Sequence, residues 1–301
     1  MPVLKNLREF AIFPERVVSL VPSMTESLFD LGMGDHLVGV TEYCVHPEQA
    51  KLLPKVGGTK NVQISRVIEL NPDLVIANQE ENTEMVVETL GQRLNVWLTF
   101  PKTVRQALDD LWQLVHLFRQ ERAFLSLRTL ETAVEYAENR LFDFQPQRVF
   151  VPIWQDQLPA GEYWWMTFNQ DTYCNDVIRL LGGVNVFAER QRRYPLSADL
   201  SVGTESPSNG RDTRYPRVIK EEVITAQPEI ILLPVSAVTP MVTVARSCVV
   251  SSTVRELTVM FVPIFRFVTM LSIKFDPRIV RTSVSSKFPL GGETLTMRGR
   301  G

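Results

Sequence analysis

A short pattern that occurs twice constrains the fold of this chain more than any other feature. Residues 64–78, ISRVIELNPDLVIAN, and residues 217–234, RVIKEEVITAQPEIILLP, each contain a short helical stretch, a proline followed by an acid, and an apolar run. An apolar run of this length is typical of a strand buried in a parallel sheet. The repeat therefore predicts two α/β lobes of similar plan, one in each half of the chain.

The first half alternates between strand and helix signals. Apolar runs rich in β-branched residues indicate strands at RVVSLVP (16–22), HLVGVTE (36–42), DLVIAN (73–78) and NVWLTF (95–100). A helix, TESLFDLGM, follows the first of them, and Ser23 or Thr25 is expected to cap its N-terminus. In the second half, RVFVPIW (148–154) predicts a strand and QDTYCNDVIRLLGG (170–183) a helix that ends at glycine.

The segment from residue 103 to 142 has a different pattern. It contains no proline or glycine, and its apolar residues recur at helical spacing, which predicts two consecutive helices, the second of them long. We therefore expect a class of fold in which a helical backbone joins two α/β lobes, with a ligand cleft between them. The predicted parts are an N-terminal lobe (1–102), a helical linker (103–142), a C-terminal lobe (143–240) and an atypical tail (241–301).

Composition excludes several classes of protein. A formal net charge of −2 over 301 residues gives no electrostatic footprint for nucleic acid. Three scattered cysteines build neither a disulfide framework nor a zinc site. Nothing before residue 245 reads as a membrane span. The first residues show no signal peptide or lipid-attachment cysteine, so we expect a cytoplasmic monomer as written, or a periplasmic or cell-surface protein if the true start lies upstream.

Several stretches together carry a resemblance to a known family. These are RVVSLVPSMTESLFDLGMGDHLVGVTEYC, LPKVGGTKN, NPDLVIANQEEN, VWLTFPKTV, WWMTFNQDTYCNDVIRLLGGVNVFAERQRRYPLS and DTRYPRVIKEEV. In order and spacing, from about residue 15 to 235, they resemble the Fe/B12-type substrate-binding proteins of ABC importers, the helical-backbone metal receptor superfamily. The resemblance is strongest to its cobalamin-binding branch, and it implies a class III periplasmic-binding-protein fold.

The resemblance implies a non-enzymatic receptor that binds a corrinoid in the cleft between the lobes and feeds an ABC importer. The alternative is an iron–siderophore or haem receptor of the same fold. In either case the metal arrives inside the ligand, with no intrinsic cofactor. The ligand-binding residues that we expect are Pro22, Ser23, Met24, Thr25, Tyr43, Trp164, Trp165, Met166, Phe168 and Tyr215.

For two groups of these residues, a purely structural role is the alternative to ligand binding. The Pro22–Thr25 turn can present helix N–H groups to a polar ligand edge, or its hydroxyls can simply cap the helix. Trp164, Trp165 and Phe168, with Trp154 nearby, form either a ligand surface or a buried apolar plug.

The stretch EYCVHP leaves a function of another class open, an enzyme that acts in the cleft, because it places a thiol two residues from an imidazole. Cys44 and His46, with Glu42, could serve a cleft enzyme, but no orienting group or oxyanion hole is visible. A zinc site needs three or four ligands, and no second Cys/His pair lies nearby. We therefore expect Tyr43, rather than Cys44 or His46, to be the functional residue of this stretch.

In cobalamin receptors a glutamate on each lobe docks onto arginines of the permease. Glu221, seven residues before Pro228, matches this position in the second lobe. Ser65, seven residues before Pro72, stands where the first-lobe glutamate is expected. The resemblance therefore implies permease docking through Glu221 alone.

The tail differs from everything before it. Residues 241–301 contain nine Lys/Arg and three acidic residues, and they lack clean helical periodicity. We hypothesise that a frameshift replaced the original C-terminus. The hypothesis is wrong if neither of the other two reading frames of the underlying DNA encodes a C-terminal helix of the receptor type.

Overall fold

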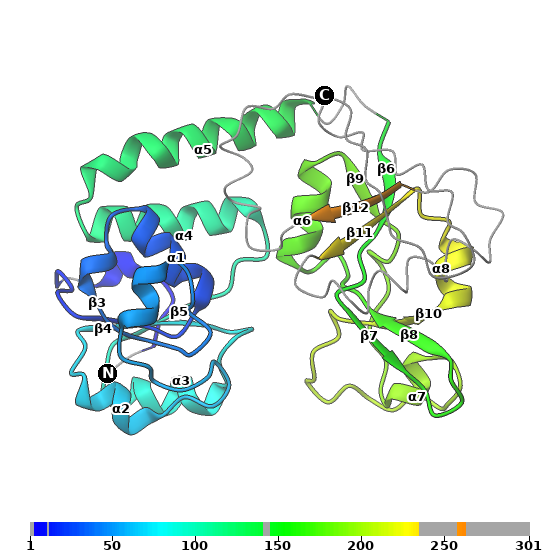
Figure 1. Ribbon diagram of the computed structural model, residues 1–301, viewed down its shortest axis with the longest axis horizontal. Helices are drawn as coiled ribbons and strands as arrows, with labels where there is room; N and C mark the ends of the chain where they lie inside the picture. Colours follow the sequence, from blue (N-terminus) through cyan, green and yellow to red (C-terminus); the bar gives the residue numbers. More distant parts are fainter. Residues whose placement is uncertain (1–2, 11, 141–144, 235–257, 263–301) are drawn as a thin grey trace, which may run out of the picture. The chain divides into compact units, whose positions relative to one another are not determined.

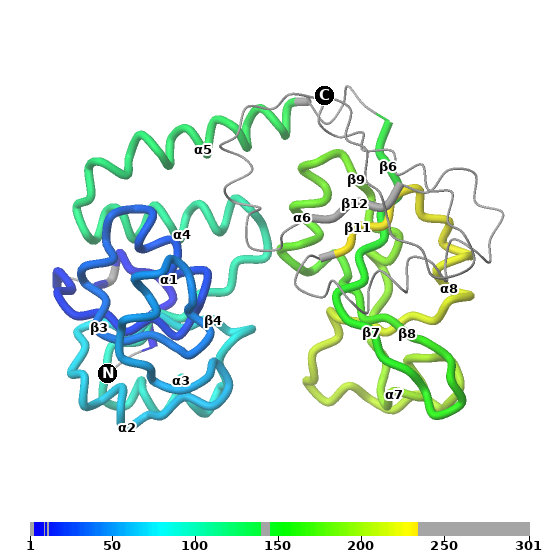
Figure 2. Tube along the Cα trace, viewed as in Figure 1, coloured from blue at the N-terminus to red at the C-terminus, as the bar shows by residue number. Residues whose placement is uncertain are grey.

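The computed structural model describes residues 3–10, 12–140, 145–234 and 258–262 (Figures 1 and 2). The chain divides into two units, residues 1–135 and 136–301. Each unit is a mixed α/β structure, as the repeated pattern predicts, and each is described by itself.

Unit 1 is built on a five-stranded sheet in which every neighbouring pair is parallel. The strand order is β1-β5-β4-β2-β3. The strands are β1 (Val3–Leu4), β2 (Val17–Ser19), β3 (Leu37–Val40), β4 (Leu74–Asn78) and β5 (Val96–Thr99). Because β2 and β4 lie inside the sheet and are covered on both faces, they are almost entirely apolar.

Helices cover both faces of this sheet (Figure 1). They are η1 (Leu7–Glu9), α1 (Pro22–Asp30), η2 (Gly34–His36), η3 (Glu48–Leu52), α2 (Ile64–Glu69) and α3 (Glu84–Gly91). Alternate residues of β4 face opposite ways: Leu74 and Ile76 pack in a core with α1, and Val75 and Ala77 in a core with α2 and α3. The sheet thus separates two apolar layers.

The two predicted consecutive helices are confirmed as α4 (Val104–Leu117) and α5 (Glu121–Arg140). Thr103 caps α4, because its hydroxyl accepts a hydrogen bond from the N–H of Gln106 at 3.1 Å. In α5 the buried residues are Ala123, Leu127, Val134 and Ala137. Ala123 and Leu127 join the same core as α1, so the start of α5 belongs to unit 1.

Unit 2 contains two sheets. The first is parallel, in the order β12-β11-β6-β9, and comprises β6 (Gln147–Phe150), β9 (Gly183–Asn185), β11 (Ile230–Pro234) and β12 (Thr258–Val262). The second is antiparallel, in the order β10-β8-β7, and comprises β7 (Trp154–Gln157), β8 (Tyr163–Met166) and β10 (Arg217–Ile219). Its helices are α6 (Tyr173–Leu180), α7 (Leu196–Asp199) and α8 (Lys220–Ala226).

Several features of unit 2 were not predicted from the sequence, among them β9 and α7. The antiparallel sheet adds to the expected parallel one, through a hairpin between β7 and β8. Within the tail, Thr258–Val262 pairs in parallel with all five residues of β11. The rest of the tail lies outside the described residues.

Candidate functional site

The candidate site of unit 1 lies where its parallel strands end. Because all five strands run in one direction, the segments that follow β2, β3 and β4 begin at the same edge of the sheet, which is where open parallel sheets bind ligands. These segments contain Pro22–Thr25, Tyr43 and the turn Asn78–Asn82.

The Pro22–Thr25 segment forms the first turn of α1. Val21 is the N-cap residue and provides no side-chain hydrogen bond, so the prediction that Ser23 or Thr25 caps the helix is wrong. Thr25 is fully buried, and its hydroxyl lies 3.1 Å from the carbonyl of Val21 and 2.9 Å from Oγ of Ser19. Ser23 is exposed and Met24 is half-buried, so these two are the accessible polar and apolar groups of the turn.

Tyr43 is the most accessible aromatic residue of this edge, with 63% of its surface exposed. A Cβ at Gly58 would lie 3.3 Å from Cε2 of the ring, so the absence of a side chain there lets the ring rest on the backbone. The N–H of Glu42 donates a hydrogen bond to the carbonyl of Gly57 at 2.9 Å. The loop is thus fixed to the 57–58 segment while one side of the ring remains available to a ligand.

Cys44 has a structural position. It is 1% exposed, and its Sγ accepts a hydrogen bond from the hydroxyl of Thr25 at 3.2 Å and lies 3.1 Å from Oγ1 of Thr41. His46 is exposed. The thiol therefore joins the loop after β3 to helix α1. Among the described residues, no group of three or more His, Cys, Asp or Glu side chains could hold a metal ion.

Asn82 was missed as a site residue in the sequence, where it ends the polar run NQEEN. It is 4% exposed, its Oδ1 accepts from the N–H of Asn78 at 2.9 Å, and its Nδ2 donates to the carbonyl of Thr59 at 2.9 Å and to that of Leu20 at 3.3 Å. One amide thereby joins three loops at the edge of the sheet. The sequence signal that could have identified Asn82 is an amide side chain one short turn after a buried strand.

In unit 2 the predicted aromatic segment is mostly buried. Trp165 packs with Phe150 and Val218 in one core, and Phe168 packs with Val149 in another. Trp164 is buried as well. Met166 is only half-buried, and its cross-strand partner on β7 is Trp154, which is 57% exposed. The accessible surface of this segment is therefore Met166 and Trp154.

Tyr215 lies beside Phe168. The N–H of Asn169 donates to the carbonyl of Arg214 at 2.9 Å, and the N–H of Thr167 to that of Pro216 at 3.0 Å. Tyr215 packs half-buried against the core that contains Phe168, and the guanidinium of Arg214 lies 5.4 Å from its ring centroid. The structure thus places Tyr215, one of the predicted ligand-binding residues, beside the aromatic segment 164–168.

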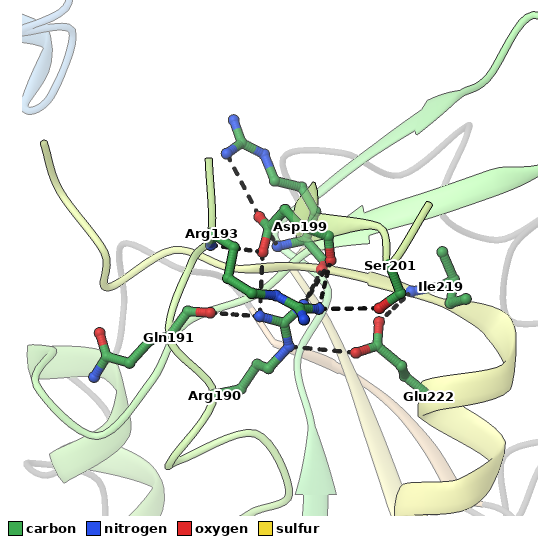
Figure 3. Close-up of polar contacts among 8 residues, drawn as sticks. Arg190, Gln191, Arg193, Asp199, Ser201, Ile219 and Glu222 are labelled. Carbon is green, nitrogen blue, oxygen red and sulfur yellow. Dashed lines mark hydrogen bonds and ion pairs between the residues drawn. The ribbon is translucent and has the colours of Figure 1, made fainter. Parts of the chain in front are cut away.

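Sequence reasoning missed a carboxylate network in the loop that follows Phe187. Asp199, at the end of α7, is fully buried and forms ion pairs with Arg190 at 3.2 Å and Arg217 at 3.7 Å (Figure 3). It also accepts hydrogen bonds from the N–H groups of Arg193 and Arg217, each at 2.9 Å. Arg190 reaches Glu222 of α8 at 3.3 Å as well. This network fixes α7 to β10 and α8.

Comparisons with known proteins agree with this architecture. A family model described as "Periplasmic binding protein" matches residues 17–234. A vitamin B12-binding protein of Yersinia pestis (strain Pestoides F) is 28% identical over 221 residues, which are 73% of this chain and 69% of that protein.

Solved structures share the fold. The periplasmic vitamin B12 binding protein of Vibrio cholerae has a TM-score of 0.62 and 24% identity, covering 86% of this chain and 94% of that one. A periplasmic heme-binding protein from Roseiflexus sp. RS-1 has a TM-score of 0.60 and 19% identity, covering 86% and 95%. In the part of the chain that the structure describes, no helix has the length and apolar character needed to cross a membrane.

Proposed function

The chain belongs to the periplasmic binding protein family, and from this membership we propose that it is a receptor for a corrinoid, a cobalamin-like ligand that it binds without chemical change. The observation that carries the proposal is the 28% identity over 221 residues to proteins named for binding vitamin B12. Any metal is then part of the ligand, and the protein supplies only the surface that holds it.

The accessible apolar groups of each unit support this ligand class. A broad macrocycle is held mainly by contact with aromatic and apolar side chains. Tyr43 and Met24 offer such groups in unit 1, and Met166 and Tyr215 in unit 2. We propose that these four residues, with Pro22 and Ser23, contact the ligand. Thr25, Trp164, Trp165 and Phe168 support them from behind, because they are buried.

The alternative within the same fold is a haem or a ferric siderophore. It is favoured by the similarity in fold to the Roseiflexus heme-binding protein and to an Fe3+-hydroxamate transport protein from Saccharomonospora viridis, with a TM-score of 0.58 and 19% identity. Both ligand types absorb visible light, as corrinoids do, so one experiment compares all three.

The chain is mixed with cyanocobalamin, haem or a ferric hydroxamate, passed through a desalting column, and read by absorbance. We expect cyanocobalamin to be retained in an equimolar amount. Tyr43→Ala should weaken binding roughly tenfold, because a buried aromatic face contributes about 1–2 kcal/mol. Tyr136→Ala is the matched control, since Tyr136 on α5 is 55% exposed. If the chain retains none of the three chromophores, the receptor proposal is wrong.

An enzyme that acts through Cys44 belongs to a different class and is opposed by the burial of that thiol. A nucleophilic cysteine must be accessible as a thiolate, and Cys44 is enclosed while Cys174 is exposed. Alkylation with iodoacetamide, followed by peptide mass mapping, should label Cys174 much faster than Cys44. Fast labelling of Cys44 in the folded chain would support the hypothesis of an enzyme that acts through this thiol.

We further propose that an ABC permease is the partner of the loaded receptor. Glu221 is exposed in the first turn of α8, where a carboxylate can reach an arginine of the permease. Ser65 is exposed on α2, at the equivalent place in unit 1. The docking charge is therefore expected in unit 2 alone.

A further inference from the structure

An exposed tryptophan lies at one side of the antiparallel sheet of unit 2. The strand order of this sheet is β10-β8-β7, and Trp154 begins β7, which is an edge strand in the part of the chain that the structure describes (Figure 1). Trp154 is 57% exposed, whereas the other four tryptophans are buried or half-buried. A single exposed apolar side chain needs no explanation, so its neighbours decide what this indole can do.

The register of the sheet places Trp154 in a row with Met166 and Arg217. Met166 on β8 is directly opposite Trp154 on β7 and directly opposite Arg217 on β10. Side chains of directly opposite residues point to the same face of an antiparallel sheet. The adjacent pair, Trp165 with Val218, points to the other face and packs in a core cluster of unit 2. The row that contains Trp154 is therefore on the face turned away from that core.

This face is covered at β10 and accessible at β7. Arg217 forms an ion pair with Asp199 at 3.7 Å, and its guanidinium lies 5.8 Å from the ring centroid of Trp164. Trp164 is two residues before Met166, hence on the same face, and it is buried. Exposure rises along the row, from the largely covered side chain of Arg217 through half-buried Met166 to exposed Trp154. The accessible part of the row is thus Trp154 with Met166.

Tyr215, a proposed ligand contact, lies on the same face. The ladder between β8 and β10 continues in the same register beyond both strands, through backbone hydrogen bonds of 2.9 and 3.0 Å between segments 167–169 and 214–216. Tyr215 is therefore opposite Phe168, two positions beyond Met166, and points to the face that carries Met166. Its half-buried ring packs in the cluster that contains Phe168.

We propose that Trp154 is a further ligand-contacting residue of unit 2, whose indole packs with Met166 against the ring face of a conjugated macrocycle. The inference rests on the proposed function and narrows the ligand class. An indole offers a flat apolar face, and a flexible thioether adapts to the shape beside it. A macrocycle can cover both groups at once, whereas a ferric hydroxamate has no ring face of that size. Trp154 thereby favours a corrinoid or a haem over a siderophore.

Replacement of the indole tests this contact. We expect Trp154→Ala to raise the Kd of cyanocobalamin roughly tenfold, because the ligand loses an apolar face that it covers in the unmodified chain. Trp154→Phe should recover most of the affinity, because a phenyl ring keeps a flat apolar face. Equilibrium dialysis read by absorbance measures each Kd. The same changes are expected for haem, and a change below twofold for a ferric hydroxamate.

Tyr163→Ala is the matched control. Tyr163 is 41% exposed on β8 of the same hairpin, where it is opposite Gln157. It is three residues from Met166 and points to the other face of the sheet. The control should bind cyanocobalamin as the unmodified chain does. A loss equal to that of Trp154→Ala would mean that the hairpin as a whole determines the affinity, and the inference would be wrong.

A second measurement needs no variant. Hydroxyl radicals modify accessible tryptophan, methionine and tyrosine side chains, and peptide mass mapping gives the rate at each residue. Saturating cyanocobalamin should slow the modification of Trp154 and Met166 severalfold and leave that of Tyr163 unchanged. Equal rates at Trp154 with and without the bound ligand would contradict the proposed contact.

The outcomes separate this inference from the receptor proposal. If cyanocobalamin or haem binds and Trp154→Ala binds it as tightly as the unmodified chain, the receptor proposal stands and Trp154 is not a contact. If the chain retains only the ferric hydroxamate, it is a receptor of another ligand class, and the inference is wrong. If it retains no chromophore, both proposals are wrong.

Discussion

At the scale of single residues, Asp199 joins the end of α7 to Arg190 and to β10 in unit 2. Its carboxylate is fully buried, and it accepts from two backbone N–H groups while it pairs with Arg190 and Arg217. A buried ion pair contributes little net stability, yet removing one partner leaves the other charges buried and uncompensated. Asp199 is therefore expected to contribute strongly to the conformation of the segment from Arg190 to Arg217.

We predict that Asp199→Ala lowers the free energy of unfolding of unit 2 by about 3–5 kcal/mol. The change is measured as the shift of the urea midpoint in circular dichroism. Asp212→Asn is the control, because the Asp212–Arg214 pair is partly exposed and should cost about 1 kcal/mol or less. Equal midpoints for the two variants would show that Asp199 does not hold the loop.

Asp110 on α4 gives a prediction for pH. Burial, and then the negative charge of Asp109, raise the pKa of Asp110 to about 7. The unfolded chain has a value of about 3.9, so between about pH 4 and pH 7 the folded state binds more protons, and stability falls as pH rises through this window. Because the side chain keeps part of its hydration, the loss is roughly 1–2 kcal/mol.

Asp110→Asn should remove this loss. Its unfolding free energy should exceed that of the unmodified chain at pH 8 and approach it near pH 4, which urea unfolding at both values tests. Asp109→Asn should reduce the slope only in part, because burial remains the larger cause. A variant with the same pH slope as the unmodified chain would contradict the assignment.

Residue types in the sequence were a good guide to location and a poor guide to exposure. Tyr43 was expected on a loop after a strand, and it lies there. One side of its ring lies against Gly58, and 63% of the residue is exposed. Trp164, Trp165 and Phe168 were expected either on the ligand surface of unit 2 or in a buried apolar plug, and they are buried. An aromatic run is consistent with either outcome, because large rings stabilise a core as well as a ligand surface.

At the scale of elements, the sequence predicted β2 to β6, β11 and the two consecutive helices α4 and α5, because a continuous apolar run indicates a buried strand and an apolar stripe at helical spacing indicates a helix. The buried strands β4 and β11 are continuous apolar runs, and α4 has a regular apolar stripe. The antiparallel strands β7 and β8 were not predicted, because WQDQ and YWWM show no alternation of apolar and polar residues. Their pairing is set by tertiary contacts.

The pairing of β12 with β11 gives a prediction about the tail. Within the described residues, β12 lies at the edge of the sheet and pairs in parallel with β11, so alternate residues direct their N–H groups toward β11. Proline placed at Val259 and, separately, at Met260 should therefore have unequal effects. The position whose N–H faces β11 should lose about 1–3 kcal/mol, and the other position much less. Equal thermal midpoints for the two variants would mean that this strand is not part of the sheet.

At the scale of the whole molecule, each half of the chain repeats a helix, a proline–acid pair and a strand. The repeat is confirmed as α2 followed by β4, and α8 followed by β11. Which side chains interact across long sequence distances was not predictable, as Asn82 and Asp199 show. Thr59 and Arg217, their partners, lie 23 and 18 residues away in the sequence, and no local period encodes such pairs.

The repeat carries different charges at the two positions that we propose for permease docking, which gives the last prediction. Glu221 on α8 and Ser65 on α2 are both exposed near the helix starts. If Glu221 binds a permease arginine, Glu221→Gln should weaken binding of the loaded chain to its permease severalfold, chiefly through the association rate, and leave ligand affinity unchanged. Ser65→Glu should strengthen it, because it restores the missing charge. Surface plasmon resonance with the permease in nanodiscs measures both. Glu229→Gln, also exposed in unit 2, is the control, and an effect equal to that of Glu221→Gln would exclude a specific docking role.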